Sequence, residues 1–156
     1  MAAGAKSEPV DLGEVARLAI SDAVAAAQAR RIDIGISHAD PAVVNGQPEA
    51  LRMLLRNLID NAVKYTPEEG RVDVGIAAVG SAVELSVEDS GPGLPEEERE
   101  RVLDRFYRSG EPQAPGSGLG LAIVKSIADL HGATVALAAS ESLGGLQVLV
   151  RFPPRA

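Results

Sequence analysis

Apolar residues recur at helical spacing most clearly over 48–65. They follow the i, i+3, i+4, i+7 rule there and predict one buried stripe, made of Leu51, Leu54, Leu55, Leu58, Ile59 and Ala62. Pro67 marks the end of this helix, because the residue before a proline disfavours helical backbone. Asp11 and Glu14 form a capping-box-like start to a helix predicted to run to about Arg30. A third helix is predicted over about 118–130, and Gly132 is a natural stop for it.

Apolar residues alternate with polar or small ones in five further segments, which predicts β-strands. These segments are 32–36, 72–76, 83–87, 134–138 and 146–152. A short turn at 79–81 predicts that the second and third of them form a hairpin, and Asn45-Gly46 indicates another turn. The order of elements predicts an α/β (α+β) two-layer fold, with helices packed on one mixed, mostly antiparallel sheet.

Two segments carry neither pattern. Residues 1–8 are small and polar, so we expect a flexible N-terminal segment over 1–9 and a single domain over 10–153. Between Ser90 and Gly118 the chain is rich in Gly and Pro at both ends, with a short charged helix predicted around 96–106. A connection of this length is either functional or mobile.

The composition narrows the functions that such a domain can have. The chain has 156 residues, 46% of them hydrophobic, and a formal net charge of -7. So acidic a chain lacks the basic face that nucleic acids and anionic membranes require, and we expect neither as a partner. The absence of Cys excludes thiolate metal sites and Cys nucleophiles, and two histidines are too few for a multi-His zinc site. No apolar run approaches the ~20 residues of a membrane span and no signal peptide opens the chain, which favours a cytoplasmic domain.

The helix predicted over 48–65 carries a polar stripe beside its apolar face. Asn57, Asn61 and Lys64 are spaced by four and three residues, so their side chains lie along one flank. Asparagine is a poor mid-helix residue, because its amide competes for backbone hydrogen bonds. Amide oxygens and an ammonium group in one small volume suit a hydrated Mg²⁺ ion and phosphate oxygens. The alternative is a solvated polar face without a ligand.

Asp89 continues the inward-facing side of the strand predicted over 83–87. A carboxylate aimed at the core is costly unless some group donates to it. Gly91 and Gly93 follow at once, and glycines allow the backbone to approach a flat ligand closely. An exocyclic amine such as that of adenine would satisfy the buried acid. The alternative is that strand pairing ends at Glu88 and that Asp89 caps a turn.

Glycines lead into the last predicted helix, in the run Gly116-Ser117-Gly118-Leu119-Gly120-Leu121. Exposed N–H groups at a helix N-terminus can bind phosphate. The spacing matches neither the Walker A loop nor the Rossmann pattern, and an ordinary turn is the alternative.

Half of the aromatic residues lie in the run Arg105-Phe106-Tyr107-Arg108. One interpretation is a mobile flap that Phe106 anchors and from which an arginine reaches a phosphate. The other is a small satellite core with solvated charges.

Taken in order, the four motifs resemble those of bacterial sensor histidine kinases. The run Leu55–Thr66 resembles their N box, and Asp89–Gly93 resembles their G1 box. Arg105–Arg108 is similar to their F box, and Gly116–Leu121 to their G2 box. The resemblance covers about residues 10–152, which is nearly the whole chain.

The resemblance implies a Bergerat-type (GHKL ATPase) fold, in which a mixed sheet is covered on one face by helices. ATP would bind between the N-box helix and a lid over about 94–118, and Asn61 would bind Mg²⁺. The catalytic residues implied are Asn57, Lys64, Arg105 and Arg108, near the metal or the phosphates. The other nucleotide-binding residues implied are Tyr65 and Asp89 at the adenine, together with Gly91, Gly93, Phe106, Gly116, Gly118, Leu119, Gly120 and Leu121.

The resemblance also implies transfer of the ATP γ-phosphoryl group to a histidine on a separate dimerisation domain, with a response regulator downstream. Relatives that hydrolyse ATP carry Glu at the position of Asn57, and Asn cannot act as a general base, so we expect no rapid hydrolysis. Neither His38 nor His131 begins a dimerisation-helix pattern, so we expect the chain to bind ATP without phosphorylating itself. It would be the catalytic domain, monomeric in isolation, of a membrane-tethered kinase.

Two other functions remain open. Anti-sigma serine kinases are single domains of the same fold, although they typically carry Glu at the position of Asn57 and lack a clear F box. A nucleotide-binding scaffold would hold ATP and signal through closure of the lid, without transfer.

Overall fold

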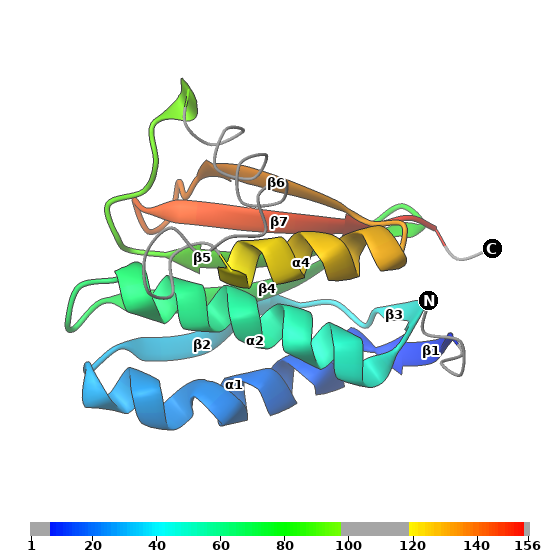
Figure 1. The fold of residues 1–156 in the computed structure, drawn as a ribbon, viewed down its shortest axis with the longest axis horizontal. Coiled ribbons are helices and arrows are strands. Elements are labelled where there is room, and N and C mark those ends of the chain that lie inside the picture. The colour runs from blue at the N-terminus through cyan, green and yellow to red at the C-terminus, as the bar shows by residue number, and fades with distance from the viewer. Residues whose placement is uncertain (1–6, 98–118, 155–156) are drawn as a thin grey trace.

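The computed structural model describes residues 7–97 and 119–154, so most of the predicted lid lies outside the described residues (Figure 1). In chain order the elements are β1 (Glu8–Asp11), α1 (Leu12–Ala29), β2 (Asp33–Ala39), β3 (Val43–Gly46), α2 (Pro48–Tyr65), β4 (Arg71–Val79), β5 (Ala82–Asp89), α4 (Leu119–Leu130), β6 (Thr134–Ala139) and β7 (Leu146–Phe152).

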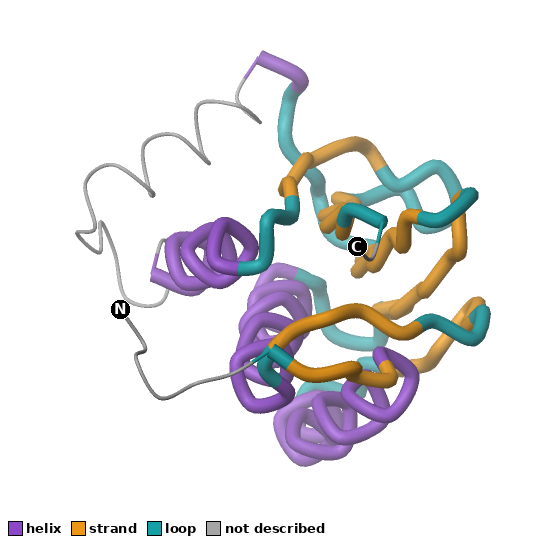
Figure 2. The backbone as a smooth tube through the Cα atoms, turned by 90° about the vertical axis from the view of Figure 1, so that its right-hand side faces the viewer, coloured by secondary structure: helices purple, strands orange, loops and turns teal. Residues whose placement is uncertain are grey.

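Within the described residues, helices α1, α2 and α4 cover one face of a mixed five-stranded sheet. Figure 1 shows α2 between α1 and α4, in front of the strands. The strand order is β2-β4-β5-β7-β6, in which β2 and β4 are parallel and the other neighbours are antiparallel. Seen from the side, the helices and the strands form separate layers (Figure 2). The predicted two-layer architecture is therefore confirmed.

The apolar stripe of α2 is its buried face. Leu54, Leu55 and Ile59 are 0% exposed, and they belong to one core with the inward residues of β4, of which Val72 and Val74 are also 0% exposed. Full burial of one such aliphatic side chain contributes about 1.5–3 kcal/mol. Because this stripe faces the sheet, the position of every other α2 side chain around the helix axis is set.

Helix α1 begins at a capped residue and packs on α2. Oδ1 of Asp11 accepts hydrogen bonds from the backbone N–H groups of Gly13 (2.9 Å) and Glu14 (3.4 Å), which satisfies two donors of the first turn. Farther along, Asp22 accepts two hydrogen bonds from Arg52 of α2, at 2.7 and 2.8 Å. This two-bond geometry fixes the relative position of the helices better than a single contact would.

A small second sheet corrects two predictions at the N-terminal end. The turn predicted at Asn45-Gly46 is wrong, because both residues lie in β3, which pairs antiparallel with β1. Glu8 and Pro9 belong to β1 and not to a flexible segment. Burial of Val10 and Val44, at 5% and 3% exposure, is the physical reason that these short segments pair.

His131 joins the end of α4 to the start of α2. Its Nε2 accepts a hydrogen bond from the backbone N–H of Gln47 (3.1 Å), and its Nδ1 lies 2.8 Å from the carbonyl oxygen of Ile127. A Cβ atom on Gly46 would lie 2.6 Å from Cδ2 of His131, so glycine is required there for close approach and not for a turn. The ring also meets Phe152 edge-on, with 6.4 Å between the ring centroids.

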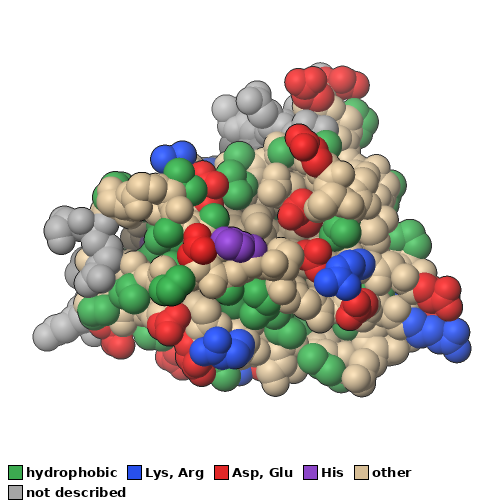
Figure 3. Space-filling model, turned by 180° about the vertical axis from the view of Figure 1, so that it is seen from behind, with side chains coloured by type: hydrophobic (Ala, Val, Ile, Leu, Met, Phe, Trp, Pro, Cys, Tyr) green, Lys and Arg blue, Asp and Glu red, His purple; other side chains and the backbone are tan. Residues whose placement is uncertain are grey.

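The other face of the sheet carries charged side chains of both signs (Figure 3). Arg71 pairs with Asp33 at 2.5 Å and with Asp73 at 2.7 Å, and Arg151 pairs with Glu84 at 3.4 Å. We call this the open face. In the part of the chain that the structure describes, no helix is both long and apolar enough to cross a membrane.

We predict that Leu55→Ala lowers the free energy of unfolding by about 2–5 kcal/mol, because it leaves a cavity in the core. Met53 is the matched control, since it lies on the same helix and is 52% exposed. Met53→Ala should change the free energy by no more than about 0.5 kcal/mol. Urea unfolding measures both values, and equal losses would contradict the assignment of the buried face.

Candidate functional site

Helix α2 presents two half-buried asparagines on the flank of its apolar face. Asn57 and Asn61 lie about one turn apart. Nδ2 of Asn57 donates a hydrogen bond to the carbonyl oxygen of Met53, one turn earlier, at 2.7 Å. Because this bond engages the amide nitrogen, Oδ1 of Asn57 is the atom that can accept a hydrogen bond or coordinate a cation.

The first turn of α4 lies against these two asparagines. A Cβ atom on Gly120 would be 3.6 Å from Oδ1 of Asn57 and 3.9 Å from Oδ1 of Asn61. The first backbone N–H groups of a helix lack intrahelical partners and carry the positive end of the helix dipole. The structure therefore brings the predicted amide pair and the predicted phosphate-binding helix end together.

The donors at this place fit a hydrated Mg²⁺ ion. Amide oxygens are hard ligands, and Mg²⁺ usually keeps several waters and shares the phosphates of its substrate. Over residues 7–97 and 119–154, no group of three or more His, Asp or Glu side chains could hold a metal ion. Because the amide oxygens of Asn57 and Asn61 are neutral, the phosphates would have to balance the charge of the ion. The metal would thus bind together with a nucleotide.

Lys64 and Tyr65 end α2 on its exposed side. Nζ of Lys64 lies 5.8 Å from the ring centroid of Tyr65, within the range of a cation–π contact. A Cβ atom on Gly91 would lie 2.7 Å from the backbone oxygen of Tyr65, so the end of α2 touches the segment that follows β5. The roles of Lys64 at a phosphate and of Tyr65 at the adenine stay predictions.

Asp89 is buried at the end of β5, with 6% of its surface exposed. The alternative in which pairing ends at Glu88 holds on one side only: pairing with β7 ends at Glu88, but pairing with β4 continues through Asp89, which stands opposite Val72. Oδ1 of Asp89 accepts hydrogen bonds from the backbone N–H groups of Gly91 (2.9 Å) and Leu146 (3.1 Å). Within the described residues, neither bond uses Oδ2, so turn capping by one oxygen leaves the other to accept from a ligand.

The burial of Asp89 changes its acidity. Desolvation raises the pKa of this carboxyl group, and the two backbone hydrogen bonds act against the shift by stabilising the ionised form. A carboxylate that is desolvated and also held in one orientation is typical of a functional site. A donor from a ligand would offset the cost of its burial.

The connection between β6 and β7 lies directly against Asp89. The sequence pattern does not predict this contact. A Cβ atom on Gly145 would overlap both the backbone oxygen and Oδ1 of Asp89, so only glycine fits. Gly93, whose φ is 72°, lies against Gly145 in turn. The Gly144-Gly145 pair directly before the last strand is the sequence signal that could have marked this contact.

The remaining predicted site residues divide into two groups. Leu119 and Gly120 lie in the first turn of α4, and Leu121 is buried at 4% exposure, so its side chain belongs to the core. The residues outside the described part of the chain are Arg105, Phe106, Arg108, Gly116 and Gly118.

We predict that Asp89→Asn leaves the ligand-free protein at least as stable as the wild type at neutral pH. Oδ1 of asparagine can accept the same two N–H groups, while the buried charge disappears. Because folding raises the pKa of Asp89, the wild type loses stability as the pH rises from the ordinary carboxyl pKa through the raised value. The variant does not titrate, so its advantage should shrink in acid. Urea unfolding at acidic and neutral pH measures this difference.

Asp89→Ala is the contrasting variant, because it removes the acceptor of two buried N–H groups. It should lower the free energy of unfolding by about 1–3 kcal/mol. An Asn variant as unstable as the Ala variant at neutral pH would contradict the described role of Oδ1.

Known proteins match most of this chain. A profile of the family described as "Histidine kinase-, DNA gyrase B-, and HSP90-like ATPase" matches residues 46–156. Sensor protein QseC of Salmonella typhi is 38% identical over 144 residues, which cover 92% of this chain and 31% of QseC. Signal transduction histidine-protein kinase/phosphatase MprB of Mycobacterium bovis (strain BCG / Pasteur 1173P2) is 38% identical over 157 aligned residues, covering 95% of this chain and 30% of MprB. The chain spans about a third of the length of these relatives.

Solved structures show the same architecture. A mycobacterial sensor histidine kinase MprB matches with a TM-score of 0.81 at 32% identity, over 96% of this chain and 98% of that chain. Full-length ShkA in complex with AMPPNP matches with a TM-score of 0.78 at 29% identity, over 95% of this chain and 31% of that chain. The chain therefore belongs to the histidine kinase-, DNA gyrase B- and HSP90-like ATPase family, as an ATP-binding catalytic domain of the sensor histidine kinase type.

Proposed function

We propose that this domain transfers the γ-phosphoryl group of ATP to a histidine on a separate dimerisation domain. The observation that carries the proposal is the convergence of Asn57 and Asn61 of α2 on Gly120 in the first turn of α4. This arrangement brings amide oxygens close to the N-terminal turn of a helix, whose first N–H groups can bind anions, and this suits a metal-bound polyphosphate. The complex of the related ShkA with AMPPNP also supports it.

The proposed adenine end of the nucleotide lies at Asp89. Oδ2 accepts from the exocyclic amine of the base, while Oδ1 stays on its two backbone donors. The segment from Gly91 to Gly93 passes close to the base, and the ring of Tyr65, 45% exposed, packs against it.

The proposed phosphate end lies between α2 and α4. Asn61 holds Mg²⁺, Asn57 lies beside the metal or a phosphate, and Lys64 binds a phosphate oxygen. When bound, Mg²⁺ neutralises charge on the phosphates. The N–H groups of Leu119 and Gly120 donate to phosphate oxygens, and Arg105 or Arg108 of the lid adds positive charge.

The proposed reaction needs positioning more than acid–base chemistry. The bond from the γ-phosphorus to the bridging oxygen of ADP breaks while a bond to an imidazole nitrogen of the partner forms. Such a transfer passes through a loose transition state, which responds mainly to alignment and charge neutralisation. Asn57 cannot take a proton from water, so hydrolysis should be slow compared with transfer.

We also propose the setting in which the domain works. The related QseC structure is of its cytoplasmic segment, which supports a cytoplasmic location for this domain within a membrane-tethered kinase. A response regulator would take the phosphoryl group from the histidine. In isolation the domain is proposed to be a monomer that binds ATP.

The deciding experiment incubates the chain with γ-labelled ATP, Mg²⁺ and a purified dimerisation domain from a related sensor histidine kinase. Acid-labile label on the histidine of that domain is the expected result. Acid-stable label on a serine would indicate the serine kinase alternative. Binding of ATP without any transfer, to this or to other dimerisation domains, would indicate a scaffold.

The metal assignment predicts the behaviour of Asn61→Ala. This variant should bind ATP about 10- to 100-fold more weakly than the wild type in Mg²⁺, because it lacks the proposed metal ligand. In the presence of a chelator the two proteins should bind ATP alike. Calorimetry measures both conditions, and Asp60→Ala, at the exposed neighbouring position, is the matched control. An unchanged Mg²⁺ dependence in Asn61→Ala would refute the assignment.

The adenine assignment predicts a different pattern for Asp89→Asn. Its affinities for ATP and ADP should fall by the same factor, about 10- to 100-fold, because an amide nitrogen replaces the proposed acceptor. The stability of the ligand-free variant should be retained, so the loss cannot come from unfolding. An unchanged ADP affinity would mean that the carboxylate only caps the turn.

A further inference from the structure

The connection between β6 and β7 is a closed, hydrogen-bonded loop. The backbone N–H of Ser140 donates to the carbonyl oxygen of Gly145 (2.8 Å), and that of Gly144 donates to the carbonyl oxygen of Ser140 (2.9 Å). The backbone N–H of Leu143 donates to Oγ of Ser140 (3.0 Å). Ser140 is 3% exposed, so its hydroxyl group is the internal support of this loop, which we call the 140–145 loop.

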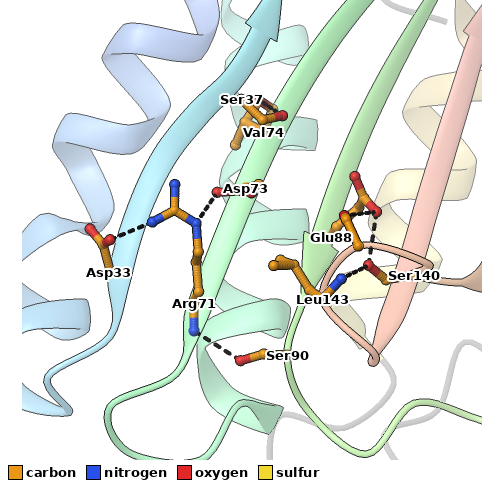
Figure 4. Close-up of polar contacts among 10 residues, drawn as sticks. Asp33, Ser37, Arg71, Asp73, Val74, Glu88, Ser90, Ser140 and Leu143 are labelled. Atoms are coloured by element: carbon orange, nitrogen blue, oxygen red, sulfur yellow. Dashed lines mark hydrogen bonds and ion pairs between the residues drawn. The ribbon is translucent and has the colours of Figure 1, made fainter.

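On the open face, Glu88 holds the loop. Oγ of Ser140 donates to Oε1 of Glu88 at 2.8 Å, and Oγ of Ser142 reaches the same oxygen at 3.3 Å. Figure 4 shows the chain of contacts from Glu88 through Ser140 to Leu143. Glu88 stands opposite Asp73 in the sheet register. Because two acidic side chains directly opposite each other are unfavourable, a hydrogen-bond donor from the loop stabilises Glu88. A hydrogen bond to a carboxylate is roughly twice as strong as a neutral one.

On the helix-covered face, the same loop holds Asp89. Glu88 and Asp89 are consecutive in β5, so their side chains point to opposite faces of the sheet. The backbone N–H of Leu146, directly after the loop, donates to Oδ1 of Asp89 at 3.1 Å. The missing side chain of Gly145 leaves the space that Oδ1 occupies. The consecutive carboxylates of Glu88 and Asp89 thus bind the same loop from the two faces of the sheet.

We propose that the 140–145 loop is a positioning element of the adenine site, and that the Ser140–Glu88 hydrogen bond on the open face sets the selectivity for a 6-amino purine. The inference rests on the proposed function. The loop fixes Oδ1 of Asp89, and this directs Oδ2 toward the base as an acceptor. Ser140 and Glu88 are positioning residues, because they act through the loop and touch no nucleotide.

The test compares ATP with inosine triphosphate, in which a carbonyl oxygen replaces the amine. Only ATP carries a donor at the 6-position of the purine, where inosine triphosphate presents an acceptor to Oδ2. The ratio of the two dissociation constants therefore reports on the position of the Asp89 carboxylate opposite that group. Ser140→Ala in the full chain should weaken ATP binding about three- to tenfold, as expected if the single hydrogen bond between the adenine amine and Oδ2 of Asp89 is lost. Binding of inosine triphosphate should stay within about twofold of the wild-type value. Calorimetry in Mg²⁺ measures both constants.

The matched control is Ser142→Ala, which loses the longer contact to Glu88 but none of the bonds inside the loop. Its selectivity should equal that of the wild type. Glu88→Gln keeps an oxygen that accepts from Ser140 and should retain the selectivity, whereas Glu88→Ala should lose it. Gly145→Ala should lose it as well, because the added methyl group displaces Oδ1 of Asp89.

The outcomes separate this inference from the proposed function. If the wild type binds neither nucleotide, both are overturned. If Asp89→Asn keeps the wild-type preference for ATP, the adenine role of Asp89 and this inference are overturned, while the proposed transfer to a histidine stands. If Asp89→Asn loses the preference while Ser140→Ala and Glu88→Ala keep it, the positioning role is overturned and the proposed function stands. Equal weakening of both nucleotides in Ser140→Ala would mean that the loop only supports the fold, which also overturns the inference.

Discussion

Packing of the apolar stripe of α2 against the sheet is the constraint on which the site depends. Leu54 and Leu55 admit one orientation of the helix about its axis, since any rotation would expose them. With that orientation set, Asn57 and Asn61 must point along the flank toward α4. The relative position of the two asparagines and α4 is therefore a consequence of core packing: burial of apolar surface, the strongest favourable term in folding, also aligns these polar groups.

At Asp89, by contrast, burial costs stability, because the buried group is charged. Its carboxylate is buried beside the core, where desolvation favours the neutral form, and two backbone donors hold it in place. A fold selected for stability alone would place a neutral side chain there. The structure keeps an ionisable group and surrounds it with glycines at positions 91 and 145, which give up side-chain packing to make room for it.

The elements that could be predicted from sequence are those with local periodicity. Helix α2 and its two asparagines follow from spacing alone, as does the β4–β5 hairpin. Asn45-Gly46 was misassigned because turn propensity is local, whereas the close approach of His131 to Gly46 is a long-range contact. Strand β1 has four residues, too few to show alternation. Gly145 was missed because only the sheet order β5-β7-β6 brings it to Asp89.

The contact of His131 with Gln47 has a mechanical consequence. His131, after the C-terminal end of α4, contacts Gly46 and Gln47 before and at the start of α2, whereas Gly120 at the N-terminal end of α4 contacts Asn57 near the middle of α2. The two helices therefore run antiparallel, and His131 holds the C-terminal end of α4. Helix α4 has 12 residues. The helix is thus about 18 Å long, so a tilt of about 5° about its C-terminal end would displace its N-terminal end by about 1.5 Å. A substitution that shifts His131 would therefore also change the distance between Gly120 and the two asparagines at the other end of α4.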